Sequence, residues 1–411
     1  MDKIKVLCLP SDKFGVGYFR SYNPHVKLSE LYGDKFDVTI EYDVLNKPLE
    51  YFSNFDIIHF SKNISSSFEK NKDVIDFLKD KKTITIMDID DYYDLGAFHP
   101  MSRAYQMSDT KRKLVENIRM SDYVTTTTEI FAEKLRMHNK NVIVIPNAID
   151  SSEKQFNPIE IKSDKIRFGI ICGSSHEYDI NLLQGMTASL PKDVFEKCQF
   201  VLCGFDTNGT MRERNPKTGE IKSRPILPTE TVWYKYEKIL TDNYKLVSNE
   251  YKSFLLRFMP GFEYIHVNDE HYRRFWTKPI NQYATHYNNI DVLLAPLKDC
   301  DFNKYKSQLK VIEAGFFHKA IIAQDFGPYT IDLKPFIENG KITENGNALL
   351  VDVKKNHKQW AKHITTLVRN PEYINILGER LFETVKNDYS IENATKIRAE
   401  FYERAFNNVN K

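Results

Sequence analysis

The chain has 411 residues, of which 41% are hydrophobic and 28% charged, and its formal net charge is +2 at pH 7. This length allows two hydrophobic cores in domains of about 200 residues each, and the composition is that of an ordinary globular protein. The small net charge excludes an overall basic field of the kind that nucleic-acid-binding proteins carry, although it leaves room for a local basic patch.

Cysteine usage and hydropathy indicate the cellular compartment of the protein. The five cysteines, at positions 8, 172, 198, 203 and 300, are scattered and odd in number. This usage argues against a disulfide scaffold or a zinc site and favours a reducing compartment. The apolar part of the N-terminus is too short for a signal peptide, and no run reaches the roughly 20 apolar residues of a membrane span. The sequence therefore predicts a cytoplasmic protein.

Strand-like apolar runs alternate with helix-like segments in the first part of the chain. The runs at 5–10, 36–42, 56–60, 83–87 and 142–145 predict strands, and the segments at 66–79 and 110–120 predict helices. The threonine run at 125–128 predicts a helix cap. Because strands and helices alternating at this spacing form doubly wound parallel sheets, we expect a Rossmann-like domain at residues 1–155. A polar linker is expected at 151–165.

Polar residues follow two of these predicted strands. Gly15 and Gly17 come after the first strand and allow a ligand to approach the backbone closely, and Arg20 enters the next helix. The acids of Asp88-Ile89-Asp90-Asp91 stand after the fourth strand, at the edge where such sheets bind ligands. Neighbouring carboxylates repel one another, so a cation, an arginine or water has to compensate them.

A second alternating pattern predicts another Rossmann-like domain at residues 156–389. Strands are expected at 166–172, 200–204, 290–296, 320–323 and near 349–351, and a helix at 180–189. The pattern breaks at 206–282, which we interpret as an insertion with helix-like segments at 233–240 and 272–283. The last helix, at about 390–411, is expected to pack back on the first domain. The predicted fold is therefore α/β, with two doubly wound parallel-sheet domains facing each other across a cleft.

The stretch 283–329 holds the strongest functional pattern. A buried strand leads through a polar loop into a helix predicted at 304–317, and a helix N-terminus in this position favours a phosphate group. Lys306, Lys310 and Glu313 are spaced four and three residues apart, which predicts that they share one helical face. Two cations beside a helix N-terminus would stabilise the growing charge of a pyrophosphate leaving group.

Several motifs together resemble the retaining, nucleotide-sugar-dependent GT-B glycosyltransferases of group 1. They are Pro146-Asn147-x-Ile149-Asp150, Gly173-Ser174-x-His176, the strand 291–297, and Lys306-Ser307-x-x-Lys310-x-x-Glu313 with Asn303 before it. The resemblance covers residues 1–205 and 283–400. It implies a donor, a UDP- or GDP-sugar, bound in the cleft mainly by the second domain, with no further cofactor and no metal. It also implies transfer with retention to a glycan or other hydroxyl acceptor, with the leaving phosphate oxygen taking the acceptor proton.

The resemblance assigns roles to particular residues. Lys306 and Lys310 would bind the diphosphate, Glu313 the ribose hydroxyls, and His99 would lie near the reacting sugar carbon. The acceptor side would hold Asp88, Asp90 and Asp91. The residues expected to line the donor site are Gly15, Gly17, Arg20, Gly173, Ser174, Ser175, His176, Asn303, Ser307, Gly327, Pro328 and Tyr329.

The chain departs from the family pattern at two places. The first of two glutamates eight residues apart, which faces the sugar in the family, is replaced by Tyr305. The usual Arg and Lys pair after the first strand of the second domain is replaced by Ser174, Ser175 and His176. The sugar contact must then come from elsewhere, such as Asn303 or backbone amides.

Three other interpretations stay open at this point. Asp88-Ile89-Asp90 is an Asp-x-Asp motif, which could hold Mg²⁺ or Mn²⁺ in a metal-dependent, single-sheet GT-A glycosyltransferase. A GT-B scaffold could also bind a glycan or nucleic acid without turnover. A phage-type DNA-base glycosyltransferase would use a basic cluster in the predicted insertion to meet phosphates. That cluster consists of Arg212, Arg214, Lys217, Lys222 and Arg224. The sequence does not determine the oligomeric state.

Overall fold

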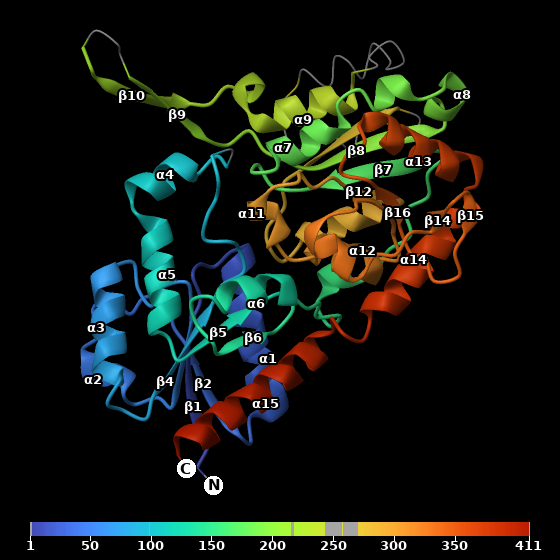
Figure 1. The fold of residues 1–411 in the computed structure, drawn as a ribbon. Helices are drawn as coiled ribbons and strands as arrows, with labels where there is room; N and C mark the ends of the chain where they lie inside the picture. Colours follow the sequence, from blue (N-terminus) through green and yellow to red (C-terminus); the bar gives the residue numbers. More distant parts are fainter. Residues whose placement is uncertain (1, 98, 215–217, 243–256, 258–269, 411) are drawn as a thin grey trace.

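Each half of the chain builds a parallel six-stranded sheet (Figure 1). The structure is a computed structural model that describes residues 2–97, 99–214, 218–242, 257 and 270–410. The prediction of two doubly wound α/β domains is confirmed. Within the described ranges, no helix combines the length and the apolar composition that crossing a membrane requires.

The first sheet has the strand order β2-β1-β3-β4-β5-β6. Its central strands are buried along their whole length, as expected for a sheet covered by helices on both faces. The strands are β1 (Ile4–Leu9), β2 (Phe36–Ile40), β3 (Ile57–Ser61), β4 (Ile84–Asp88), β5 (Tyr123–Thr126) and β6 (Val142–Val144). The helical segments are η1 (Gly17–Tyr22), α1 (Asn23–Tyr32), α2 (Leu49–Phe52), α3 (Phe68–Leu78), α4 (Ser102–Met107), α5 (Thr110–Met120) and α6 (Glu129–Leu135). The Thr128 hydroxyl accepts a hydrogen bond from the Phe131 amide, so the expected threonine cap begins α6.

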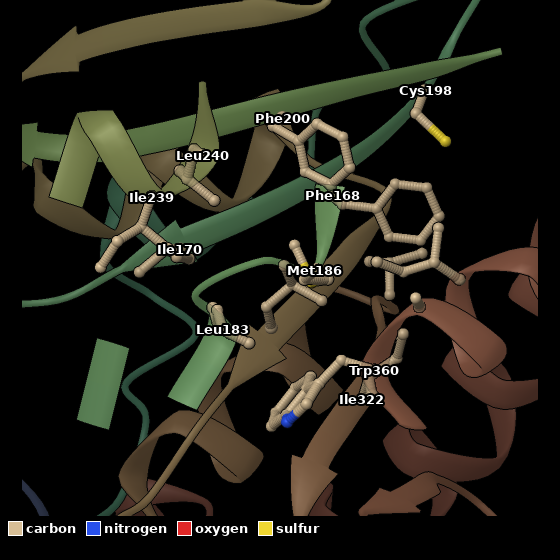
Figure 2. Packing of buried hydrophobic residues seen from close by; sticks show 14 of the residues in the cluster. Phe168, Ile170, Leu183, Met186, Cys198, Phe200, Ile239, Leu240, Ile322 and Trp360 are labelled. Atoms are coloured by element: carbon tan, nitrogen blue, oxygen red, sulfur yellow. The ribbon is translucent and has the colours of Figure 1, made fainter. Parts of the chain in front are cut away.

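The second sheet has the order β11-β8-β7-β12-β13-β16. Alternate residues of β12 point into separate cores on its two faces, Val292 and Leu294 into one and Leu293 and Ala295 into the other. Figure 2 shows the first of these cores, where Phe168 and Phe200 lie together and Trp360 lies further along the same cluster. The strands are β7 (Ile166–Ile171), β8 (Cys198–Phe205), β11 (Tyr272–Trp276), β12 (Val292–Ala295), β13 (Ala320–Gln324) and β16 (Leu349–Val351). The longer helices are α9 (Val232–Leu240), α12 (Leu309–Phe316), α13 (His357–Arg369), α14 (Glu372–Val385) and α15 (Ile391–Val409).

Shorter elements complete the second domain. They are η2 (Lys154–Phe156), α7 (Glu177–Ile180), η3 (Asn181–Leu183), η4 (Thr187–Ser189), α8 (Lys192–Phe195), β9 (Thr210–Arg214), β10 (Ile221–Pro225), η5 (Pro228–Glu230), η8 (Tyr283–Asn289), α11 (Asp301–Lys304), η9 (Gly327–Ile331), β14 (Ile337–Glu338) and β15 (Lys341–Ile342). The linker predicted at 151–165 contains η2, whose Phe156 is buried in the core of the second domain.

Helix α15 crosses back from the second domain to the first (Figure 1). Its Ala394, Phe401 and Tyr402 pack in one core with Ile4 and Val6 of the first sheet. The crossover is tied at its start by a bridge between Ile149 and Ser390. The two domains are therefore connected by two chain segments, one near Ile149 and one near Ser390, and by the packing of α15 on the first domain.

Three element predictions were wrong. The helix expected at 180–189 is broken into short turns, because Gly185 adopts a left-handed φ of +87°. The helix-like segment expected at 272–283 is instead strand β11, which pairs in parallel with β8. The helix expected at 304–317 begins only at Leu309, after a loop in which Gln308 donates hydrogen bonds to Asp332 and Tyr389.

The segment 206–282 is only partly an insertion. Strands β9 and β10 form an antiparallel hairpin that projects away from its own domain (Figure 1). Helix α9 and strand β11 belong to the domain itself, since Trp233, Tyr236 and Tyr272 lie in its core. Residues 243–256 and 258–269 of this segment lie outside the described part of the chain.

Candidate active site

A cavity of about 590 Å³ lies between the two domains, at the carboxyl ends of their strands. The first domain contributes the loops that follow β1, β4 and β6, and the second contributes those after β7, β8, β11 and β12. Most of the residues expected to bind the donor line this first cavity. They are Gly15, Arg20, Gly173, Ser174, His176, Lys306, Ser307, Lys310, Glu313 and Tyr329. Asp90 and Asp91, which were expected on the acceptor side, line the same cavity.

Glu313 is buried in the wall of the first cavity, at 4% exposure. Its carboxylate accepts hydrogen bonds from the Tyr283 hydroxyl and, at 2.7 Å, from the Tyr287 hydroxyl. Burial raises the pKa of Glu313, and the two hydroxyl donors oppose that rise. Because a carboxylate has about four acceptor positions, two remain for a ligand after both tyrosines are bound.

The two lysines reach the cavity from different structural positions. Lys310 stands in the first turn of α12, and its Nζ donates to the Ile171 carbonyl at 2.5 Å. Lys306 lies in the loop before α12, with its Nζ 3.6 Å from the Asp91 carboxylate. The prediction that both lysines and Glu313 share one helical face was therefore wrong. The loop nevertheless brings both ammonium groups to the same cavity, beside a helix N-terminus.

The pair Arg20 and Asp88 is buried at the wall of the cavity, at 3% and 0% exposure, and of the two only Arg20 lines it. The guanidinium binds the carboxylate with two hydrogen bonds, of 2.6 Å and 3.1 Å, and also donates to the Ile145 carbonyl at 2.7 Å. Asp88 also accepts a hydrogen bond from the Thr125 hydroxyl. Asp88 does not line the cavity, so the acceptor-binding role expected for it does not follow from its position. Arg20 compensates its charge instead.

Asp90 and Asp91 lie closer to the cavity than Asp88. Asp90 pairs with Lys62 at 2.8 Å, and burial raises its pKa despite that ammonium. Asp91 faces Lys306 across the cleft. The acids of the Asp-x-Asp motif are thus each held by a cationic side chain, Asp88 by Arg20 and Asp90 by Lys62.

Several predicted residues hold loops in place. Asn303 is buried and donates to the Asp179 carboxylate at 2.8 Å, and His176 binds the other oxygen of Asp179 at 2.7 Å. Gly17 lies so close to the Asp12 carbonyl that a Cβ would approach it to 2.0 Å. Gly327 has φ +56° and packs against the backbone at 303–304. Neither glycine lines the first cavity, and neither does Pro328.

A second cavity, of about 440 Å³, adjoins the first. Lys306 lines both cavities. His99 lies in the second one, with its ring edge-on to Phe302 at a centroid distance of 4.7 Å. Burial and the nearby Lys306 ammonium lower the pKa of His99. Ser175 and Asn303 also line this second cavity.

Sequence analysis missed the far end of the first cavity. The missed lining residues come from the end of β8 and the residue after it, from the loop after β11, and from α9 and η8. They are Gly204, Asp206, Trp233, Thr277, Lys278, Ile280, Tyr283 and His286. Most of them were assigned to an insertion outside the site. The available signal was the run 272–276, because recognising it as a strand would have placed Thr277 and Lys278 at a ligand-binding edge.

The hairpin β9–β10 holds the basic cluster considered for DNA binding. Arg224 binds both Glu213 and Glu230, at 2.7 Å and 2.8 Å, and Lys222 lies 3.7 Å from Glu220. Lys217 lies outside the described residues. Acidic partners in the hairpin and in the following η5 therefore offset part of the basic cluster.

No family model matches the sequence, and no curated protein matches it in sequence. Solved structures match nearly the whole chain. Sucrose-phosphate synthase from Thermosynechococcus elongatus is 14% identical, with a TM-score of 0.59 and 99% of each chain covered.

Two further structures agree with this match. Anabaena HepE in complex with UDP and glucose is 10% identical, with a TM-score of 0.57, and covers 98% of this chain and all of its own. The catalytic domain of starch synthase IV from Arabidopsis thaliana, bound to ADP and acarbose, is 12% identical, with a TM-score of 0.57. It covers 98% of this chain and 99% of its own. The expected fold is thus confirmed and the single-sheet GT-A interpretation is wrong, because the chain has the two-domain GT-B fold of these glycosyltransferase structures.

Proposed function

We propose that the chain is a glycosyltransferase that moves a sugar from a nucleotide-diphosphate sugar to an acceptor hydroxyl, with retention and without a metal. The observation that carries the proposal is the first cavity, where Lys306 and Lys310 stand beside the N-terminus of α12 and Glu313 lies one helical turn further on. Structural neighbours were solved with UDP, UDP-glucose or ADP, which supports a nucleotide-sugar donor.

The charges of the cavity fit a diphosphate at one end. As the bond between the sugar C1 and the phosphate oxygen breaks, negative charge grows on the leaving nucleoside diphosphate. Lys306, Lys310 and the positive end of α12 stabilise that charge more in the transition state than in the ground state. Glu313 accepts hydrogen bonds from the ribose hydroxyls with the positions that Tyr283 and Tyr287 leave open.

The transfer step needs no enzyme nucleophile. The acceptor oxygen forms the new bond to C1 on the face from which the phosphate departs, and the acceptor proton passes to the leaving phosphate oxygen. The products are the glycosylated acceptor and the nucleoside diphosphate. Arg20 holds Asp88 and stays outside this chemistry as a structural group.

Metal independence is tested by chelation. The carboxylates of the Asp-x-Asp motif are already paired with Arg20 and Lys62, and the two lysines supply the charge that a metal would otherwise provide. Transfer should therefore continue in the presence of EDTA. Loss of transfer on chelation, restored by Mg²⁺ or Mn²⁺, would refute this part of the proposal.

The central experiment combines a donor screen with one substitution. UDP-, GDP- and dTDP-sugars are tested for release of the nucleoside diphosphate, and the accepted donor is then used with Lys310→Met. Removing one preorganised charge should lower kcat by about 100- to 1,000-fold. Lys192→Met is the matched control, because Lys192 is an exposed lysine of the same domain, 77% accessible, that lines neither cavity. Full activity of Lys310→Met would contradict the proposed role of this lysine.

The screen also decides between catalysis and binding alone. If no sugar nucleotide is turned over while a glycan or DNA binds tightly, the chain is a binding protein on a GT-B scaffold. The departures at Tyr305 and at Ser174 to His176 motivate that second candidate.

A further inference from the structure

We infer that the second cavity is the acceptor site and that it takes a neutral saccharide, with a sugar ring against Tyr178 and Phe302. This inference rests on the proposed function, since it assigns the second substrate of the same reaction. The cavity, of about 440 Å³, is lined by Tyr92, Asp94, Leu95, Gly96 and His99 of the first domain and by two loops of the second domain. A volume of this size is typical of a small-molecule site.

The position of the second cavity suits an acceptor. Lys306 lines both cavities. Two pairs of consecutive residues are divided between them, since Asp91 and Ser174 line the first cavity and Tyr92 and Ser175 line the second. The Lys306 Nζ also lies 4.4 Å from the centroid of the Phe302 ring. A phosphate held by Lys306 in the first cavity would thus stand next to a ligand packed on Phe302 in the second, which is the arrangement that sugar transfer requires.

The lining of the second cavity matches the two kinds of surface on a sugar ring, with aromatic rings for its C–H face and polar groups for its hydroxyls. Tyr178 is 45% exposed, and Phe302 forms a T-shaped pair with the His99 ring at a centroid distance of 4.7 Å and has the Lys306 Nζ over one face. The axial C–H groups of a pyranose pack on aromatic faces, and aromatic rings add large apolar contact with little loss of rotamer freedom. Exposed Ser175, Asp299 and Asp301 provide acceptors for the hydroxyl groups at the ring edge.

The charge of the lining favours a neutral ligand over a polyphosphate. Its acids are Asp94, Asp179, Asp299 and Asp301, of which Asp94 is paired with Lys111, and its bases are Lys298 and Lys306. Among the described residues, no ion pair joins Asp299 or Asp301 to a cation. A nucleic-acid backbone would meet uncompensated carboxylates here, where phosphate contacts need lysine and arginine. The structure therefore assigns the acceptor to saccharides and makes DNA the competing outcome.

The test uses the full chain, Tyr178→Ala and a matched control. Tyr42→Ala is the control, since Tyr42 is a tyrosine of similar exposure, 41%, that lines neither cavity. Neutral gluco-, manno- and galacto-configured oligosaccharides, phosphorylated forms of the same sugars and a short DNA duplex are offered as acceptors. Saccharide binding is followed separately by saturation-transfer NMR, and nucleotide affinity by calorimetry.

The expected result is a split between the two substrates. Tyr178→Ala should lower the acceptor kcat/KM at least about tenfold more than it lowers nucleotide affinity, and it should weaken the NMR signal of the bound saccharide. Tyr42→Ala should change neither, and phosphorylated sugars should be poorer acceptors than neutral ones.

Different failures point to different errors. Equal saccharide binding and transfer by Tyr178→Ala and the wild type would overturn the inference, as would transfer to DNA with none to a saccharide. Donor turnover by a wild-type protein that contacts no saccharide would also overturn it and leave the proposed function standing. Saccharide binding that depends on Tyr178, without turnover of any donor, would refute the proposed function alone.

Discussion

The acid sensitivity of the second domain should depend on His286. This residue is 2% exposed, and neither ring nitrogen has a hydrogen-bond partner among the described residues. Burial, helped by the Lys278 ammonium, lowers its pKa from 6.5 to about 3. Between these values the unfolded chain binds one more proton than the folded chain, so the free energy of unfolding falls as the pH falls. At about 1.4 kcal/mol per pKa unit, lowering the pH from 7.5 to 5 costs about 2 kcal/mol through this residue.

His286→Leu removes the titrating group and keeps an apolar side chain of similar size in the same place. We expect its free energy of unfolding to lose about 2 kcal/mol less than that of the wild type between pH 7.5 and pH 5. The three tryptophans of the chain, Trp233, Trp276 and Trp360, all lie in one core of the second domain. Tryptophan fluorescence during urea unfolding therefore reports on the domain that contains His286. Parallel stability curves for the two proteins across this pH range would refute the reasoning.

Two further substitutions test the buried charges around the first cavity. Arg20→Met leaves Asp88 buried without its cation and should lower the free energy of unfolding by about 3–5 kcal/mol, measured by denaturation followed by circular dichroism. The double variant with Asp88→Asn should recover much of this loss. A loss below about 1 kcal/mol in Arg20→Met would contradict the structural role of the pair. Glu313→Gln should weaken binding of the nucleoside diphosphate about tenfold and leave inorganic pyrophosphate binding unchanged, as measured by calorimetry, because a lost ribose contact affects only the ligand that has a ribose. Equal weakening for both ligands would place Glu313 against the diphosphate or in a general structural role.

Sequence reasoning succeeded where burial leaves a continuous signal. Strands such as β3 and β12 are buried on both faces, so their residues form unbroken apolar runs that can be recognised without a partner. The fold class follows from the order of such runs. Strand β11 was missed because Arg273 and Arg274 interrupt its apolar pattern, and the charge of the buried Arg274 is compensated by Glu237 of α9. That compensation depends on a residue 37 positions away.

The candidate site was predictable in part for the same reason. The residues at 306–313 form a local pattern in the sequence, so their grouping could be expected. Lys306 nevertheless reaches the cavity from a loop and not from the predicted helical face, because the helix begins only at Leu309. His286 and Tyr283 join the cavity only through the tertiary packing of η8, in which the His286 ring meets Phe275 of β11. Nothing in their local sequence distinguishes them from ordinary core residues, and only the tertiary structure shows that His286 has no hydrogen-bond partner among the described residues.

The structure also explains why position 305 lacks an acid. Tyr305 lines neither cavity and packs against rings of the first domain, with centroid distances of 4.7 Å to Tyr92 and 5.9 Å to Phe131. A glutamate at this half-buried position would lose these ring contacts and place a charge against apolar rings. The loop therefore has a tyrosine in place of the acid because the side chain at position 305 makes the aromatic contact between the domains. We accordingly expect the donor sugar to be held by polar groups that do line the first cavity, such as His176 and Ser307.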